Sequence, residues 1–165
     1  MIYNNEQVKK FLPHREPFLF IDTVEKVFVD KGKALPSDRL PTPDDLIELG
    51  ATVCCRFNLR ENLDILKGHF PGQPILPGVV QVEMMAQSSA FNYAQTMADP
   101  LNAKIEVALL TIKESKFRKP ITPPADLYIF SKCIKRRGNM YNYEGWIEVG
   151  GVCHSQAFFM ATIGH

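Results

Sequence analysis

Residues 78–98 are mostly apolar, and Glu83 is the only charged residue among them. Apolar side chains recur on neighbouring helical turns and also cover the opposite side of the segment, which predicts an α-helix buried inside the domain. Pro77 stands at or beside the first turn, where a helix tolerates proline. A carboxylate within such a helix is costly unless it is paired or protonated. Glu83 is therefore the first candidate for chemistry.

The pattern after this helix predicts strands. Asp99-Pro100 is a stop signal, and beyond it apolar and polar residues alternate in four long segments, at 105–117, 127–136, 140–149 and 152–163. Turns are predicted at 119–124, 137–139 and 150–151, and the Gly-Gly pair in the last is typical of a two-residue hairpin. We expect a meander of these four strands, forming an antiparallel sheet that wraps the helix.

The N-terminal half is predicted to hold shorter elements and one irregular excursion. In order, these are a helix at 6–12, a strand at 18–29, a turn at 30–33 back into a second strand, an excursion at 36–50 with a helical turn at 44–49, a strand at 51–59 and a loop at 61–66.

Composition narrows the class of protein. With 165 residues, 45% of them hydrophobic and 22% charged, the chain suits one compact domain over residues 1–165. A net charge of +1 argues against bulk binding to nucleic acid. The four cysteines lack metal-type spacing and suit reduced, buried thiols. No apolar run approaches the roughly 18 residues of a membrane-spanning helix, and the N-terminus lacks the plan of a signal peptide. We expect a soluble, cytoplasmic protein.

Ordered motifs carry a resemblance to a known family. Residues 12–22, Leu-Pro-His-Arg-Glu-Pro-Phe-Leu-Phe-Ile-Asp, resemble the N-terminal signature of the β-hydroxyacyl-acyl-carrier-protein dehydratases of bacterial fatty acid synthesis. Residues 68–79, Gly-His-Phe-Pro-Gly-Gln-Pro-Ile-Leu-Pro-Gly-Val, and 82–87, Val-Glu-Met-Met-Ala-Gln, resemble its active-site signature. Residues 116–120, Lys-Phe-Arg-Lys-Pro, resemble the strand end beyond the helix. The resemblance covers nearly the whole chain, although the excursion at 36–50 is longer than the family leads us to expect.

The resemblance implies a hotdog fold of the α+β class, in which a long antiparallel sheet wraps a central helix. It also implies a homodimer whose two sheets run together, with an active site at the interface that takes His69 from one subunit and Glu83 from the other. Whether such dimers assemble into trimers of dimers stays open. The substrate would be carried on the phosphopantetheine arm of acyl carrier protein, and no other cofactor is implied.

The implied reaction is dehydration of 3-hydroxyacyl-[acyl-carrier-protein] to the trans-2-enoyl product. In this family, the form that only dehydrates has glutamate at the acidic position, and the form that also isomerises the double bond has aspartate. Glu83 therefore favours the simple dehydratase. The alternatives are the dehydratase–isomerase, a thioesterase on the same fold, and a non-catalytic acyl-carrier-binding module. Retention of both His69 and Glu83 argues against the binding module.

Dehydration of a 3-hydroxyacyl thioester requires a base at C2 and an acid at the C3 hydroxyl. Histidine changes charge near neutral pH, so His69 is the predicted base. Hydroxide is a poor leaving group, and a carboxyl in an apolar helix tends to keep its proton, so Glu83 is the predicted acid. His69 precedes Glu83 by 14 residues, a proline-stiffened loop and under two helical turns. This spacing would place both side chains near one helix end.

The first turn of the helix is predicted to bind the thioester. Free N–H groups at a helix N-terminus can stabilise enolate charge on the thioester oxygen. Pro77 has no N–H, so the amides of Gly78 and Val79 are the candidates. Gln87, one turn after Glu83, is placed to hydrogen-bond its carboxyl. The predicted substrate-binding residues are Phe70, Pro77, Gly78, Val79 and Gln87, and no metal ligand is predicted.

Other polar residues receive simpler interpretations. We assign His14 and Arg15 to bracing the N-terminal turn, and His154 to a partly exposed strand position. Seven basic residues are predicted to form one cluster, which is either a solvated face or a docking surface for an acidic carrier protein. They are Lys116, Arg118, Lys119, Lys132, Lys135, Arg136 and Arg137.

Overall fold

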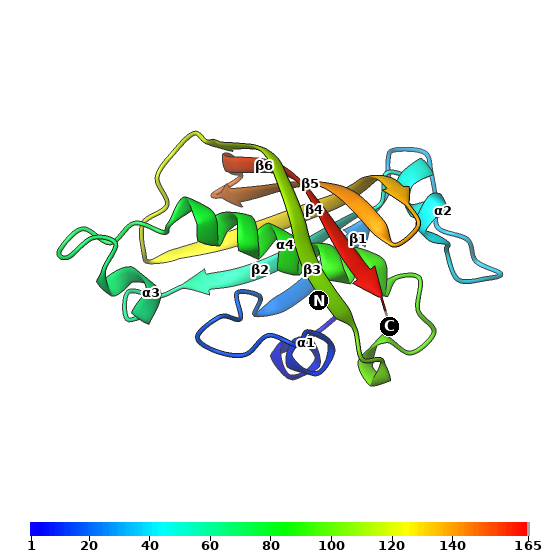
Figure 1. Cartoon of the computed structure of the whole chain (residues 1–165), viewed down its shortest axis with the longest axis horizontal. Helices are drawn as coiled ribbons and strands as arrows, with labels where there is room; N and C mark the ends of the chain where they lie inside the picture. Colours follow the sequence, from blue (N-terminus) through cyan, green and yellow to red (C-terminus); the bar gives the residue numbers. More distant parts are fainter. Residues whose placement is uncertain (165) are drawn as a thin grey trace.

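A computed structural model describes residues 1–164 as an antiparallel sheet with one long helix against it (Figure 1). The elements are α1 (Asn5–Phe11), β1 (Thr23–Phe28), α2 (Pro43–Glu48), β2 (Thr52–Leu59), α3 (Asp64–Lys67), α4 (Gly78–Ala94), the 3-10 turn η1 (Pro100–Asn102), β3 (Glu106–Phe117), β4 (Ala125–Arg137), β5 (Met140–Val149) and β6 (Val152–Gly164).

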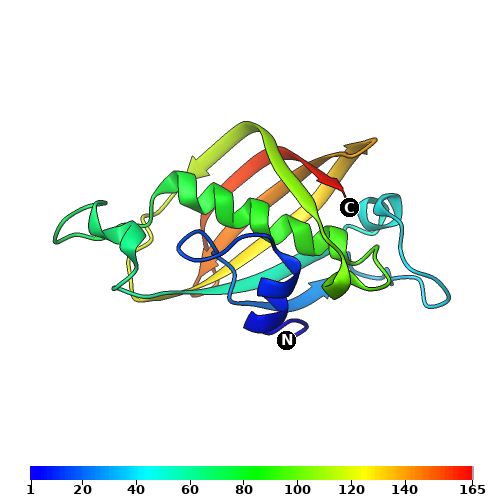
Figure 2. The same ribbon diagram turned by 60° about the horizontal axis from the view of Figure 1, so that its bottom comes forward.

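The six strands have the order β1-β2-β4-β5-β6-β3, and every neighbouring pair is antiparallel. Figure 2 shows the sheet curling around α4, which confirms the predicted architecture. The predicted meander is correct for β4, β5 and β6 but wrong for β3, which pairs with β6 at the sheet edge. Alternation along a strand defines its two faces but not its neighbour, so this pairing could not be predicted from the pattern.

The N-terminal half departs from the prediction in three places. The strand expected at 18–29 begins only at Thr23, and the second strand expected after the turn at 30–33 is absent, since residues 29–42 have no strand structure. The loop expected at 61–66 contains the short helix α3. The expected helices are present as α1 and α2, each opened by a capping box, at Asn4 and at Thr42.

Twelve of the 17 residues of α4 are buried. On the sheet side the approach is so close that a Cβ on Gly145 of β5 would lie 2.7 Å from the Cβ of Met85. On the opposite side α1 covers the helix, with the rings of Phe11 and Phe91 5.1 Å apart. The predicted burial of this helix is therefore confirmed within one chain. None of the helices described within residues 1–164 has the length and apolar character needed to cross a bilayer.

The excursion at residues 36–50 lies at the end of the sheet away from α3 (Figure 1). Arg136 of β4 donates two hydrogen bonds to Asp44, at 2.7 and 2.5 Å, and Arg39 donates two to Asp45, at 2.6 and 3.1 Å. These bonds lower the pKa of both carboxyl groups. The excursion is thus tied to the far end of β4 and does not cover the His69 loop.

Candidate active site

His69 lies in the segment between α3 and α4, which projects beyond the N-terminal end of α4 (Figure 1). Its Nδ1 is 2.8 Å from the carbonyl oxygen of Ile75. Since a carbonyl only accepts, this contact needs the proton on Nδ1 and leaves the lone pair of Nε2 free to act as a base. The ring stacks on Phe70, with centroids 4.2 Å apart, and Phe70 is itself 52% exposed.

Glu83 lies on the second turn of α4, and its side chain is 20% exposed. Gln87 Nε2 donates to Glu83 Oε1 at 2.9 Å, so the predicted hydrogen bond between these residues is confirmed. The sequence pattern placed Glu83 in an apolar environment. The structure adds that polar side chains, Gln87 and His14, contact its carboxyl group.

Gln87 joins α4 to the N-terminal segment. Its Oε1 accepts from the backbone N–H of Phe20 at 2.9 Å, and its Nε2 also donates to the carbonyl of Phe18 at 2.9 Å. Only 2% of Gln87 is exposed. Because both ends of the amide are engaged within the chain, the geometry favours a role in holding Glu83 over the direct substrate contact predicted for Gln87.

His14 lies beside Glu83, whereas the sequence interpretation gave it only a bracing role in the N-terminal turn. Its Nε2 is 3.4 Å from Glu83 Oε1, and both side chains are about four-fifths buried, at 21% and 20% exposed. Arg15 alone supplies the predicted bracing, because its Nη1 donates to the carbonyls of Leu12 and His14 at 2.8 and 2.7 Å. The only signal for His14 was its place in the N-terminal motif.

His69 and Glu83 of one chain line different cavities. The cavity at His69 is bounded by Gly78, Gln81 and Phe117. The cavity at Glu83 lies between α4 and the β3–β6 edge and is lined by His14 and Gln87 together with small and apolar side chains. Within residues 1–164 no hydrogen bond or ion pair joins His69 to Glu83. One chain therefore presents the two groups separately.

The N-terminus of α4 opens beside His69. Pro77 is the N-cap, so the N–H groups of Gly78 and Val79 belong to the first turn, which lacks intrahelical acceptors. Gly78 faces the Phe117 ring so closely that a Cβ would lie 2.9 Å from it. Val79 is 78% exposed. Glycine at position 78 thus lets the Phe117 ring pack directly against the first turn of α4.

The seven basic residues do not form one cluster. Lys116 is the penultimate residue of β3, and Arg118 and Lys119 follow this strand and line the His69 cavity. The other four lie in β4 towards its hairpin with β5, where Arg136 is bound to Asp44 and Lys132 lies 3.5 Å from Asp30. Through β6 and β5, Lys116 is in register with Phe130 of β4, so two strands separate it from the four basic residues of β4. The prediction of a single cluster was wrong, because β3 pairs with β6 and not with β4, and the pattern along a strand does not fix its neighbour.

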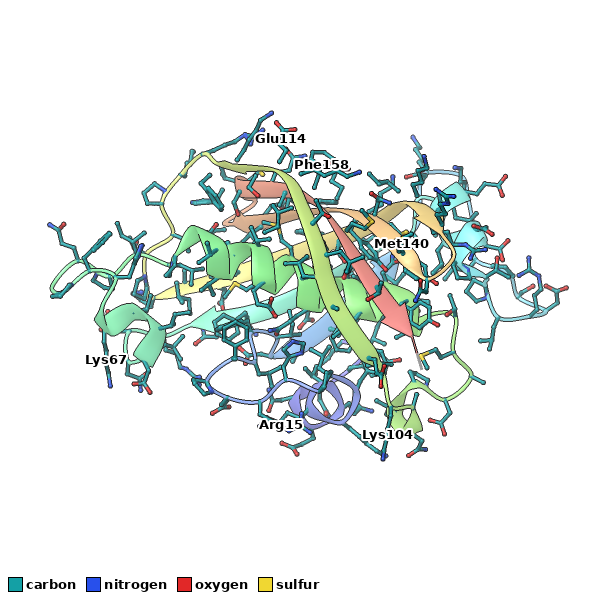
Figure 3. The ribbon with its side chains drawn as sticks, in the orientation of Figure 1. Arg15, Lys67, Lys104, Glu114, Met140 and Phe158 are labelled. Carbon is teal, nitrogen blue, oxygen red and sulfur yellow. The ribbon has the colours of Figure 1, made fainter. Side chains whose placement is uncertain are left out.

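Within residues 1–164, no three His, Cys, Asp or Glu side chains gather as a metal site requires. Figure 3 shows how widely the charged side chains are spread, with Lys67, Arg15 and Glu114 on separate parts of the surface.

The sequence of this chain matches the ApeI-like dehydratase family, described as ApeI dehydratase, over residues 47–155. It is 34% identical to the 3-hydroxyacyl-[acyl-carrier-protein] dehydratase FabZ of Erythrobacter litoralis, across 98% of this chain and 93% of the relative. The chain belongs to this dehydratase family. The family resemblance of the sequence motifs is thereby confirmed. The FabZ of Rickettsia africae is 30% identical, over 99% of this chain and 97% of that relative.

Solved structures confirm the hotdog fold. The dehydratase heterocomplex ApeI:P from Xenorhabdus doucetiae superposes with a TM-score of 0.69 at 17% identity, covering 96% of this chain and 91% of that one. A mutant thioesterase, PA1618 from Pseudomonas aeruginosa, superposes with a TM-score of 0.60 at 9% identity, covering 99% and 95%. At these identities the likeness concerns the fold alone, which serves both reaction classes.

Proposed function

We propose that this protein dehydrates 3-hydroxyacyl groups carried by acyl carrier protein, giving trans-2-enoyl thioesters, with no cofactor beyond the carrier's phosphopantetheine arm. The observation that carries the proposal is that the chain holds one group suited to accept a proton and another suited to donate one. His69 has a free Nε2 lone pair, whereas Glu83 is a partly buried carboxyl held by a neutral amide. Family membership supports the same reaction.

In the proposed reaction, His69 Nε2 removes a proton from C2 of the substrate. The electron pair of the C2–H bond becomes the C2–C3 double bond, and the C3–O bond breaks. Glu83 delivers its proton to the departing oxygen, so that water leaves in place of hydroxide. Proton exchange with solvent then returns both groups to their starting states.

Negative charge that develops on the thioester oxygen needs hydrogen-bond donors near that oxygen. The amides of Gly78 and Val79 meet this need, since they lie at the open N-terminus of α4 and beside the His69 cavity. The positive end of the helix dipole points the same way. Pro77 begins the helix, and Phe70 stacks against the base. These four residues form the proposed binding surface for the reacting thioester.

We further propose that the complete site forms between two copies of the chain. β3 is an edge strand whose unpaired side offers backbone groups to another strand. Leu109, Leu110, Ile112 and Phe117 of β3 are 40–50% exposed. An exposed apolar edge of this kind normally marks an interface. Within one chain His69 and Glu83 are apart. Pairing of two subunits along β3 would let His69 of one subunit approach Glu83 of the partner subunit.

The carrier protein is proposed to dock beside the His69 cavity. Arg118 and Lys119 are exposed and line this opening. An acidic partner would be attracted to them, and its prosthetic arm would enter directly above the base. The basic residues of β4 lie on the far side of β5 and β6 from Arg118 and Lys119, and Lys132 and Arg136 are engaged by Asp30 and Asp44.

The test is turnover of 3-hydroxyacyl thioesters of several chain lengths, followed by the absorbance of the enoyl product. The wild type should form trans-2-enoyl product. His69→Ala and Glu83→Ala should each lower kcat by about 10²–10⁴-fold, as expected for general acid–base groups. The exposed Glu106 and the partly exposed His154 provide alanine controls. Absence of enoyl product from the wild type, or hydrolysis of the thioester in its place, would reject the proposal.

A further inference from the structure

Two side chains converge on one oxygen of Glu83. Gln87 Nε2 lies 2.9 Å from Oε1, and His14 Nε2 lies 3.4 Å from the same atom. A carboxyl group has two chemically different oxygens once it is protonated: the carbonyl oxygen accepts hydrogen bonds and the hydroxyl donates one. An acid catalyst works only if its hydroxyl, and not its carbonyl oxygen, faces the leaving group.

We propose that His14 is a positioning residue that works with Gln87 to make Oε1 the accepting oxygen of Glu83 and Oε2 the proton-donating oxygen. Donors on Oε1 favour the carboxyl orientation in which the proton sits on Oε2, because a hydroxyl on Oε1 would face two N–H groups. This inference rests on the proposed function, since it concerns how the acid delivers its proton.

The surroundings hold His14 in the required place. Arg15 Nη1 bonds to the carbonyls of Leu12 and His14, which fixes the backbone on both sides of the ring. The segment that follows is tied to α4 through the hydrogen bonds of Gln87 to Phe18 and Phe20. The imidazole is therefore a rigid neighbour of Glu83.

The ring's own hydrogen bonding favours donation to Glu83. His14 Nδ1 is buried and has no hydrogen-bond partner among residues 1–164. A neutral imidazole carries one proton, and a proton on Nε2 is the one that can point towards Oε1. A proton on Nδ1 would leave a buried donor unsatisfied and turn a lone pair towards the Glu83 oxygen, which costs free energy on both counts.

The experiment compares His14→Phe, which removes the donor, with His14→Gln, whose Nε2 can occupy the position of the imidazole Nε2. With a 3-hydroxyacyl thioester, His14→Phe should lower kcat about tenfold, the effect of one lost orienting hydrogen bond, and leave KM within about twofold. His14→Gln should recover most of the loss. His154→Phe, a substitution at a partly exposed histidine, is the matched control and should behave as wild type.

A second substrate separates positioning of the acid from general damage to the site. A 3-chloroacyl thioester loses chloride, which leaves as an anion and needs no proton, while His69 still removes the C2 proton. On this substrate His14→Phe should retain wild-type kcat within about twofold, and Glu83→Gln should behave likewise. Spontaneous elimination is subtracted from every rate.

Three results would overturn the proposal: unchanged kcat of His14→Phe on the hydroxy substrate, equal losses on both substrates, or a His14→Gln variant as impaired as His14→Phe. If His14→Phe does not fold, His14→Asn replaces it, since its shorter amide cannot reach Oε1. An inactive wild type would instead reject the proposed function, so the two failures are distinguishable.

Discussion

Gln87 allows a direct test of how the N-terminal segment is fastened to α4. In Gln87→Leu the side chain keeps a similar volume but loses its hydrogen bonds to Phe20 N–H, Phe18 carbonyl and Glu83. Leaving a buried backbone donor unsatisfied costs about 1–3 kcal/mol, and the partly buried Phe18 carbonyl adds about 1 kcal/mol. The free energy of unfolding should therefore fall by about 2–4 kcal/mol.

The matched control is Gln81→Leu on the same helix. Gln81 is also buried, but it makes one hydrogen bond, to the Leu76 carbonyl, and its Oε1 has no partner among residues 1–164. Leucine would remove that unsatisfied oxygen along with the single bond, so the change should stay within about 1 kcal/mol. Urea unfolding at one protein concentration measures both variants. Equal losses, or a Gln87→Leu loss below about 1 kcal/mol, would refute the assignment of Gln87 as the fastening residue.

Two further predictions concern the surface and the thiols. The double charge reversal Arg118→Glu with Lys119→Glu should weaken turnover of carrier-linked substrate and spare turnover of small thioesters. The control pair Lys135→Glu with Arg137→Glu, in β4, should leave the turnover of both substrates unchanged. Equal effects of the two pairs would contradict the docking proposal. Burial raises the pKa of Cys54 to about 11 and of Cys55 and Cys133 to about 12, so at pH 8 a thiol reagent should modify the half-buried Cys153 first, as counted by mass spectrometry. Rapid modification of any buried thiol in the native protein would show that the sheet opens there.

The sequence predicted those parts of the fold whose cause is local. Alternation placed β4, β5 and β6 within two residues of their observed ends, and the glycine pair placed the last hairpin. Residues 18–22 have equally strand-like composition, yet they leave the sheet because Phe18 and Phe20 hydrogen-bond the side chain of Gln87. A long-range contact of this kind leaves no trace in local periodicity.

The same distinction applies to the candidate site. Glu83 could be predicted as a site residue because it is the lone charged residue in an apolar helix. The hydrogen bond from Gln87 to Glu83 could be predicted because the two residues are one helical turn apart. The approach of His14 to Glu83 spans 69 residues and depends on the path of the N-terminal segment. The separation of His69 from Glu83 within one chain depends on the direction in which the loop projects, which sequence spacing leaves open.

Subunit complementation tests the central claim most directly. His69→Ala and Glu83→Ala proteins, each inactive, are mixed under conditions that exchange subunits, and enoyl formation is measured. If each site takes His69 from one subunit and Glu83 from the partner subunit, a mixed dimer carries one intact site and one doubly altered site. Random exchange makes about half of the dimers mixed, so activity should recover to about a quarter of wild type. Demonstrated exchange without any recovery of activity would contradict a site shared between two chains.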